Sequence, residues 1–224
     1  MFFSKLALLL FASAEVPFAL CRTLQDAVEL VQIGSDIDGE AAGDRTGHSV
    51  SMSGDGSKIA IGSPGLGEDN NGRGISKGHV RIYEWESSNW KQVGDDIVGT
   101  FANTNNHKCL VSMSTDGNRV AVSNVLSDVN DPQSGQVRIY EWESTDLKWL
   151  LLGGPLNGKK NSDHVGYSLS MSSDGNKLAI GSPYNDGNGP VNFASGRLSI
   201  YEWTKSESTW TQIGYLIGEV YANA

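Results

Sequence analysis

The chain has 224 residues, a formal net charge of −9 and two cysteines. Its acidic character disfavours nucleic acid and anionic lipid as partners, because both require basic patches on a protein. With only Cys21 and Cys109 we expect no disulfide framework, so stability must come from the packing of secondary structure.

Residues 1–21 have the composition of a secretory signal peptide. Lys5 precedes the apolar run Leu6–Phe11, and small residues occur before Cys21. This run is too short to span a membrane, and no stop-transfer pattern follows it. We therefore expect a secreted or cell-surface protein whose mature chain, from about residue 22, has no membrane span. A single-pass anchor is the alternative.

An internal repeat organises the rest of the chain. Successive units place a glycine at Gly34, Gly94, Gly153 and Gly214, which gives spacings of 60, 59 and 61 residues. The phrases Ser-Met-Ser-x-Asp-Gly and Ile-Tyr-Glu-Trp each occur three times, and all six tryptophans fall at two positions of the repeat. Within residues 22–224 the expected units are 29–89, 90–148, 149–209 and a partial one, 210–224.

Each unit predicts four short strands, which in the first unit are Glu29–Ile33, Ser49–Ser53, Lys58–Ser63 and His79–Trp85. Apolar and polar residues alternate along them, and no segment has a helical period. Four-stranded antiparallel units that stack radially are the blades of a β-propeller. The expected fold is therefore all-β, with about three four-stranded blades plus a partial one, in an incomplete or open propeller.

The connection between the second and third strands predicts a hairpin in every unit. It contains an Asp-Gly pair, in which the aspartate accepts a local backbone hydrogen bond and the glycine adopts a positive φ. The three pairs are Asp55–Gly56, Asp116–Gly117 and Asp174–Gly175. The next strand carries small residues on one face, Ala60 and Gly62 in the first unit, which predicts close contact with a neighbouring sheet.

Two motifs resemble a known family. Val165–Ser168, followed by Ala179–Pro183, resembles the FG-GAP repeat found in the head propeller of integrin α chains. The first unit matches it with Gly47–Ser49 and Gly62–Pro64, whereas the second unit departs from it, for example at Lys108–Leu110. The resemblance covers residues 29–224 and implies a propeller, usually of seven blades, that serves adhesion or ligand binding through its loop faces.

WD-type propeller repeats are the rival interpretation. The string Ser-x-Asp-Gly followed by a basic and a hydrophobic residue resembles them too. Their period is about 40–45 residues, however, and no unit here closes on Trp-Asp. The longer period and the Gly-Ser-Pro after the third strand favour the FG-GAP resemblance.

Calcium is the cofactor that the family resemblance suggests. Many FG-GAP repeats hold calcium in a loop with several aspartates, but the Asp-Gly turns here contain one acidic residue each, so that function is not carried over to them. The long loops after the third strands contain Asp69, Asp128 and Asp186, which we take as calcium candidates because calcium prefers oxygen ligands from flexible loops. A turn-rich loop without metal explains the same composition.

Cys109 and the recurring tyrosines are expected to be structural. Cys109 lies in a strand-like run, where a buried inert thiol is the simplest interpretation. Tyr83, Tyr140 and Tyr201 recur at one position of the repeat, which favours core packing over a carbohydrate site.

The sequence favours a binding function. Motifs such as His-Glu-x-x-His, Gly-x-Ser-x-Gly and Cys-x-x-Cys do not occur. We expect a non-enzymatic module that binds a protein or a glycan outside the cell through its loop faces. The alternatives are a carbohydrate-active enzyme, a glycosidase or lyase, and a WD-type scaffold. Closed propellers have four to eight blades, so we also expect a truncated product, a fragment, or an oligomer that completes the ring.

Overall fold

The computed structural model describes residues 31–65, 67–68, 74–76, 78–98, 108–186 and 194–218. The expected signal peptide, residues 1–21, lies outside them, as do the first two residues of the expected strand Glu29–Ile33; the other three, residues 31–33, do not form a strand. The chain divides into two units, 1–33 and 34–224, and the sheets described below belong to the second. In the described residues the regular structure is entirely β-strand, so they contain no helix that could cross a membrane.

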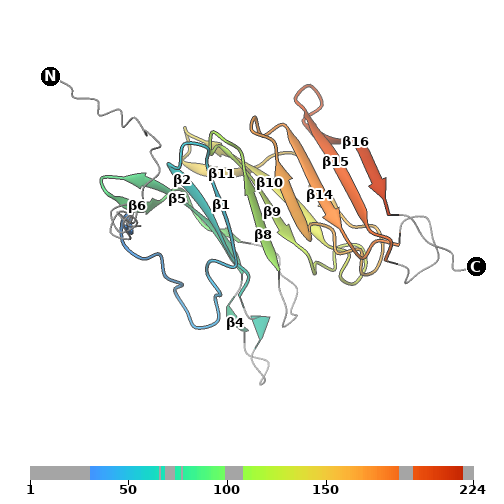
Figure 1. Cartoon of the computed structure of the whole chain (residues 1–224), viewed down its shortest axis with the longest axis horizontal. Coiled ribbons are helices and arrows are strands. Elements are labelled where there is room, and N and C mark those ends of the chain that lie inside the picture. Colours follow the sequence, from blue (N-terminus) through green and yellow to red (C-terminus); the bar gives the residue numbers. More distant parts are fainter. Residues whose placement is uncertain are drawn as a thin grey trace, which may run out of the picture. The chain divides into compact units, whose positions relative to one another are not determined.

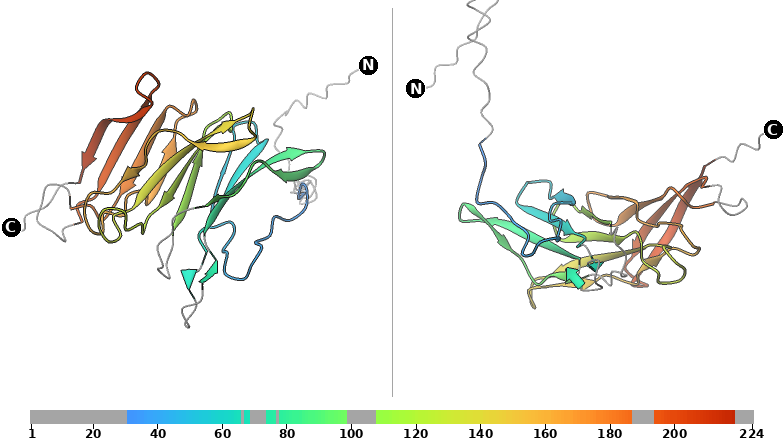
Figure 2. Two further views of the ribbon diagram at one scale, coloured as in Figure 1. Left: turned by 180° about the vertical axis from the view of Figure 1, so that it is seen from behind. Right: turned by 90° about the horizontal axis from the view of Figure 1, so that it is seen from below.

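Three antiparallel sheets follow one another along the chain and lie side by side (Figures 1 and 2). The first has the order β1 (Ser49–Met52), β2 (Lys58–Ser63), β5 (His79–Glu86) and β6 (Asn89–Gln92), and β7 (Ile97–Val98) also pairs with β5. The second has β8 (Cys109–Met113), β9 (Arg119–Asn124), β10 (Gln136–Glu143) and β11 (Lys148–Leu151), and β12 (Leu156–Asn157) pairs with β10. The third has β13 (Ser168–Met171), β14 (Lys177–Ser182), β15 (Arg197–Thr204) and β16 (Thr209–Ile217).

These sheets are propeller blades, and the expected fold class is confirmed. Each is a four-stranded antiparallel meander whose faces pack against the next sheet, which is the construction of an open β-propeller. A short hairpin of β3 (Gly67–Glu68) and β4 (Gly74–Ser76) extends from the connection between β2 and β5.

The predicted unit boundaries are wrong by one strand. The strand expected to open each later unit is hydrogen-bonded to the strand before it, so that Trp90 lies opposite Trp85 and Trp210 opposite Trp203. Residues 210–217 therefore complete the third sheet and do not begin a fourth blade. The reason is local. The two-residue turn Ser87–Ser88, with φ values of 53° and 69°, closes a tight hairpin between β5 and β6.

The hydrophobic core lies between successive sheets. Between the first and second sheets it includes Val80, Ile82 and Val120, and between the second and third it includes Ile139 and Ile180. All five side chains are almost completely buried. Tyr140 and Tyr201 pack against these two clusters, which confirms the expected core packing for two of the three recurring tyrosines. Tyr83 is half-buried and belongs to neither cluster.

Small residues let the sheets approach closely, as the sequence predicted. Ala60 is fully buried in the first interface. A Cβ atom added to Gly62 would lie 3.2 Å from the main-chain oxygen of Cys109 in the next sheet. Cys109 itself is fully buried and not in a disulfide, which confirms the prediction of a buried thiol.

Serine hydroxyls connect the innermost strands β1, β8 and β13. In each case a serine Oγ of one sheet accepts a hydrogen bond from a main-chain N–H on the inner strand of the next sheet. The bonds run from Val111 N to Ser49 Oγ (3.0 Å), from Met113 N to Ser51 Oγ (3.0 Å) and from Met171 N to Ser112 Oγ (2.9 Å). The first serine of the Ser-Met-Ser phrase, together with Ser49 two residues before it in the first unit, therefore joins neighbouring blades.

Candidate binding site on the long-loop face

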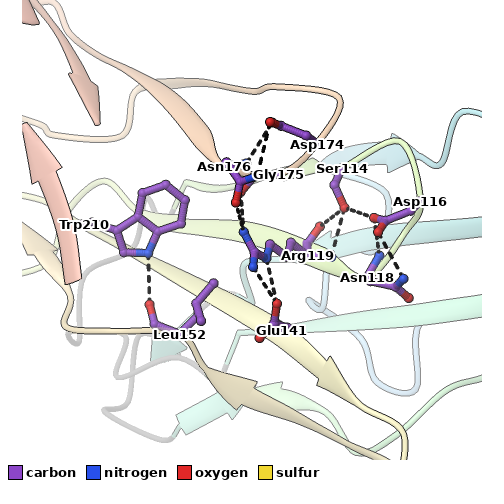
Figure 3. A network of polar contacts seen from close by, with 10 residues as sticks. All are labelled: Ser114, Asp116, Asn118, Arg119, Glu141, Leu152, Asp174, Gly175, Asn176 and Trp210. Carbon is purple, nitrogen blue, oxygen red and sulfur yellow. Dashed lines mark hydrogen bonds and ion pairs between the residues drawn. The ribbon is translucent and has the colours of Figure 1, made fainter. Parts of the chain in front are cut away.

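The Asp-Gly turns form one face of the propeller, and their aspartates act in the turn itself, as predicted. Asp116 Oδ1 accepts hydrogen bonds from Asn118 N (3.0 Å) and Ser114 Oγ (2.6 Å), and Gly117 has a φ of 66° (Figure 3). The other two turns repeat this arrangement. Arg119 then joins Glu141 in its own sheet to Asn176 in the next one. The polar groups of this face therefore stabilise the turns and join neighbouring sheets.

The calcium candidates lie in the long loops, at the opposite ends of the strands. Asp69 is outside the described residues. Asp128 Oδ1 accepts a hydrogen bond from Gln133 N (2.7 Å), and Asp186 Oδ1 accepts one from Ala194 N (3.2 Å). Each carboxylate closes its own loop. Within the described ranges no group of three or more His, Cys, Asp or Glu side chains could hold a metal. Calcium binding stays a prediction.

Two buried aspartates that the sequence reasoning missed organise the loops before β1 and β13. Asp163 is 3% exposed; its Oδ2 accepts hydrogen bonds from Lys159 N and Lys160 N, and its Oδ1 accepts one from Asn185 Nδ2. Asp44 is 4% exposed and holds the equivalent loop of the first repeat. Both precede the glycine of the FG-GAP-like motif by three residues, and this recurrence was a usable signal.

A cavity of about 90 Å³ lies between the second and third sheets, beside Asp163. The basic side chains Lys159, Lys160 and Arg197 line it, together with the hydroxyl groups of Ser182 and Ser199 and the amide of Gln212. Lys159 and Lys160 come from the connection after β12, whereas the other four residues belong to the third sheet. The cavity therefore combines positive charge with hydrogen-bonding groups on two sheets.

An aromatic cluster neighbours this cavity along the chain: His164 stands between the lining residues Asp163 and Val165, and Tyr184 stands next to the lining residue Asn185. The ring of Tyr184 is edge-on to His164 at 4.8 Å and to Tyr167 at 5.8 Å between centroids. Tyr184 is 48% exposed. Lys108 Nζ donates a hydrogen bond to Tyr167 Oη (2.9 Å), which lowers the pKa of the tyrosine hydroxyl.

The surroundings of His164 favour the uncharged form of its imidazole. Partial burial and the nearby Lys108 ammonium lower the pKa of its imidazole below the ordinary 6.5. Its Nε2 lies 3.2 Å from Gln133 Oε1. The cluster therefore presents aromatic rings, one neutral imidazole and the Lys108 ammonium, which suits contact with a hydroxyl-rich ligand. Tyr167 lies in the FG-GAP-like motif and Lys108 in the corresponding segment of the second unit. The sequence did not show that they meet Tyr184 and His164, because the four residues come from three separate segments.

Comparison with known proteins shows likeness of fold. No family model and no curated protein matches the sequence. Among solved structures, Sqt1 of Saccharomyces cerevisiae is similar with a TM-score of 0.50 at 10% identity, over 84% of this chain and 39% of that one. Hydrazine synthase of Kuenenia stuttgartiensis has a TM-score of 0.44 at 12% identity, over 86% and 40%. TolB of Acinetobacter baumannii has a TM-score of 0.37 at 13% identity, over 74% and 31%. The chain spans less than half the length of these structures.

Proposed function

We propose that this protein is a non-enzymatic binding module of FG-GAP type that works outside the cell and recognises a glycan through the long-loop face of its second and third sheets. The observation that carries the proposal is the aromatic cluster of the exposed Tyr184 with the half-buried Tyr167 and His164, which neighbour in sequence the residues that line a polar cavity. Export is supported by the composition of residues 1–21, and the family by the repeated Gly-x-Ser and Gly-Ser-Pro phrases.

The chemistry of this face matches that of a sugar. Aromatic side chains offer large, rigid contact area with a polar tip, and Tyr184 and Tyr167 present both near one another. The cavity adds the hydroxyl and amide groups of Ser182, Ser199 and Gln212, which can exchange hydrogen bonds with sugar hydroxyls. The Asp-Gly face has comparable polar groups, but they are occupied by the framework contacts of Arg119 and its neighbours.

A glycan array screened with the mature chain tests the proposal, followed by calorimetry with the best ligand. Tyr184→Ala should weaken binding by about tenfold, because a central aromatic contact is worth more than 1 kcal/mol. Leu147→Ala is the matched control, since Leu147 is 66% exposed but lies in the turn between β10 and β11 on the other face. Equal losses in both variants, or an array without any bound glycan, contradict glycan recognition at this face.

The same ligand separates a binding module from an enzyme. The protein is incubated with the glycan for a day, and new reducing ends and unsaturated products are measured. We expect the ligand to be recovered intact. Turnover would make the protein a glycosidase or lyase, and binding only to a protein ligand would move the proposal to that class.

A further inference from the structure

The first sheet holds an ion-pair cluster around the buried Arg81, at the place that corresponds to the cavity of the third sheet. Arg81 is 8% exposed and donates from Nε and Nη2 to the two carboxylate oxygens of Asp96, both at 2.8 Å. Its Nη2 also lies 2.8 Å from Glu40 Oε2. Glu40 comes from the segment before β1, whereas Arg81 and Asp96 belong to the first sheet and its β6–β7 connection.

The repeat allows each of these residues to be compared with its counterpart in the third sheet. Gly34 and Gly153 have φ values of 74° and 75°, and a Cβ on either would lie within 2.8 Å of a tryptophan ring, Trp85 or Trp203. Six residues after each glycine stand Glu40 and Lys159 respectively. The loop before the third sheet thus carries a lysine where the loop before the first sheet carries a carboxylate.

The sheet positions have changed as well. Counted from the Ile-Tyr-Glu-Trp phrase, Ser199 stands where Arg81 stands. Ser199 pairs with Tyr215 across the strands, whereas the register of β5 and β7 places Asp96 opposite Arg81. All three residues of the first-sheet cluster are therefore replaced in the third sheet. A serine replaces Arg81, a tyrosine replaces Asp96 and a lysine replaces Glu40.

These replacements explain why the cavity exists and what charge it has. A serine is much smaller than an arginine, so space remains between the sheets, and Arg197 extends over it. Arg197 Nε donates to Ser199 Oγ (3.1 Å), and its guanidinium lies 4.7 Å from the centre of the Tyr215 ring. In the part of the chain that the structure describes, no carboxylate forms an ion pair with Arg197. The carboxylate of Asp163, also at the cavity, is already bonded to three N–H donors.

We propose that this cavity binds the carboxylate of an acidic sugar. The inference rests on the proposed glycan function and names the chemical class of the ligand. The guanidinium of Arg197 matches the planar carboxylate, and Lys159 stands at the repeat position where the first sheet presents an acid. One water needs about 10–15 Å³ of such space, so about 90 Å³ admits a carboxylate with its adjoining carbon atoms. The rest of the sugar then lies toward Tyr184.

Calorimetry with a matched pair of ligands tests the inference: trigalacturonate, and the same trisaccharide with every carboxyl group methyl-esterified. We expect the acid to bind the mature chain at least tenfold more tightly than the ester. Arg197→Gln should remove this preference while the ester still binds as before. Added NaCl should weaken binding of the acid alone, because exposed charges are screened. Equal affinity for both ligands, or an unchanged preference in Arg197→Gln, would overturn the inference.

A second variant restores two of the three first-sheet residues and guards against a folding defect. The double substitution Ser199→Arg with Lys159→Glu refills the cavity and supplies a carboxylate that corresponds to Glu40. Its Tm should be at least that of the unmodified chain, and its preference for the acid should disappear. A folded double variant that still prefers the acid would place the site elsewhere.

The two proposals fail differently. A glycan array that finds only neutral sugars overturns the carboxylate site and leaves glycan binding in place. An array that finds no sugar overturns the proposed function. If trigalacturonate binds the unmodified chain, the Tyr184→Ala variant separates the two sites. An undiminished preference of this variant for the acid would show that the cavity acts without the aromatic cluster.

Discussion

The indole Nε1 of Trp210 donates a hydrogen bond of 3.0 Å to the main-chain oxygen of Leu152, and this bond ties the last strand of the third sheet to the second sheet (Figure 3). The same bond runs from Trp149 to Val93 one interface earlier, also at 3.0 Å. The second tryptophan position of the repeat is therefore a connector between sheets as well as a member of a cross-strand pair.

Replacement of this tryptophan should loosen the sheet interface. Trp210→Phe keeps an aromatic ring but leaves the Leu152 oxygen without its donor, so the free energy of unfolding should fall by about 1 kcal/mol more than in a control that only shortens the ring. Trp142→Phe is that control, because the Trp142 indole donates no hydrogen bond to any described residue. Urea denaturation followed by fluorescence measures both, and equal losses would remove the role assigned to the bond.

The glycine at the start of each full repeat lies against a tryptophan ring of the sheet that follows it. Gly153 has a φ of 75°, and a Cβ there would lie 2.7 Å from a Trp203 ring carbon. Gly153→Ala should therefore cost about 2 kcal/mol or more in unfolding free energy, through backbone strain and the clash. Gly214 occupies the same repeat position, lies inside β16 and has no atom within 4 Å of an added Cβ.

Gly214→Ala is consequently the matched test. It should leave stability unchanged or raise it slightly, since glycine in a strand is less stable than alanine by about 0.5–1 kcal/mol. Thermal unfolding of the two variants side by side gives the answer. A Gly214→Ala protein as unstable as Gly153→Ala would mean that the glycines serve something other than contact with the next sheet.

Stability should decline in acid because of the turn aspartates. Hydrogen bonds from Ser57 and Ser53 lower the pKa of Asp55 from 3.8 to about 2, and bonds from Ser172 and Asn176 lower that of Asp174 to about 2. A carboxyl group with a lower pKa in the folded state stabilises the protein above its unfolded pKa, and this contribution is lost as the pH falls toward the folded value.

The Tm should therefore fall between pH 4 and pH 2 by more than it changes between pH 7 and pH 5. In the double variant Asp55→Asn with Asp174→Asn the fall should be smaller, because these two groups no longer titrate. Scanning calorimetry across this range checks the prediction, and an identical acid slope in the double variant would contradict it.

The thiol of Cys109 should be inert in the folded protein. Burial raises its pKa to about 12, so the reactive thiolate is scarce at neutral pH. In a Cys21→Ser variant, where Cys109 is the sole cysteine, Ellman's reagent should react slowly at pH 8 and rapidly in 6 M urea. Rapid reaction without denaturant would show that the interface between the first two sheets opens easily.

The strands could be predicted because their signals are local. Lys58–Ser63 was predicted with the boundaries that β2 has, and the Asp55–Gly56 turn forms with the expected hydrogen bond and positive φ. The assignment of strands to sheets failed where the turn had an unusual composition. Both residues of the Ser87–Ser88 turn have positive φ values, which Asn-Gly usually supplies in such turns. The sequence therefore contained no turn signal that would join β6 to β5.

The candidate site was not predictable in the same way. Arg197, Lys159 and Tyr184 belong to no recognisable sequence motif. The aspartate-rich long loops were interpreted as calcium sites instead. The cavity forms because the third repeat has the small Ser199 where the first two repeats have Arg81 and Arg138. Its meaning depends on which loop residue stands across the interface, and the sheet assignment must be known before that residue can be identified.

The serine hydroxyls on the inner strands have a consequence for how the protein behaves at high concentration. An outermost strand of any sheet offers N–H groups to which a foreign polypeptide can add, which is how aggregation often begins. Here Val111, Met113 and Met171 already give their N–H groups to hydroxyls of the neighbouring blade. A foreign strand could attach along β8 or β13 only by breaking these bonds, so two of the three inner rims are protected against strand exchange by the same short phrase that repeats through the sequence.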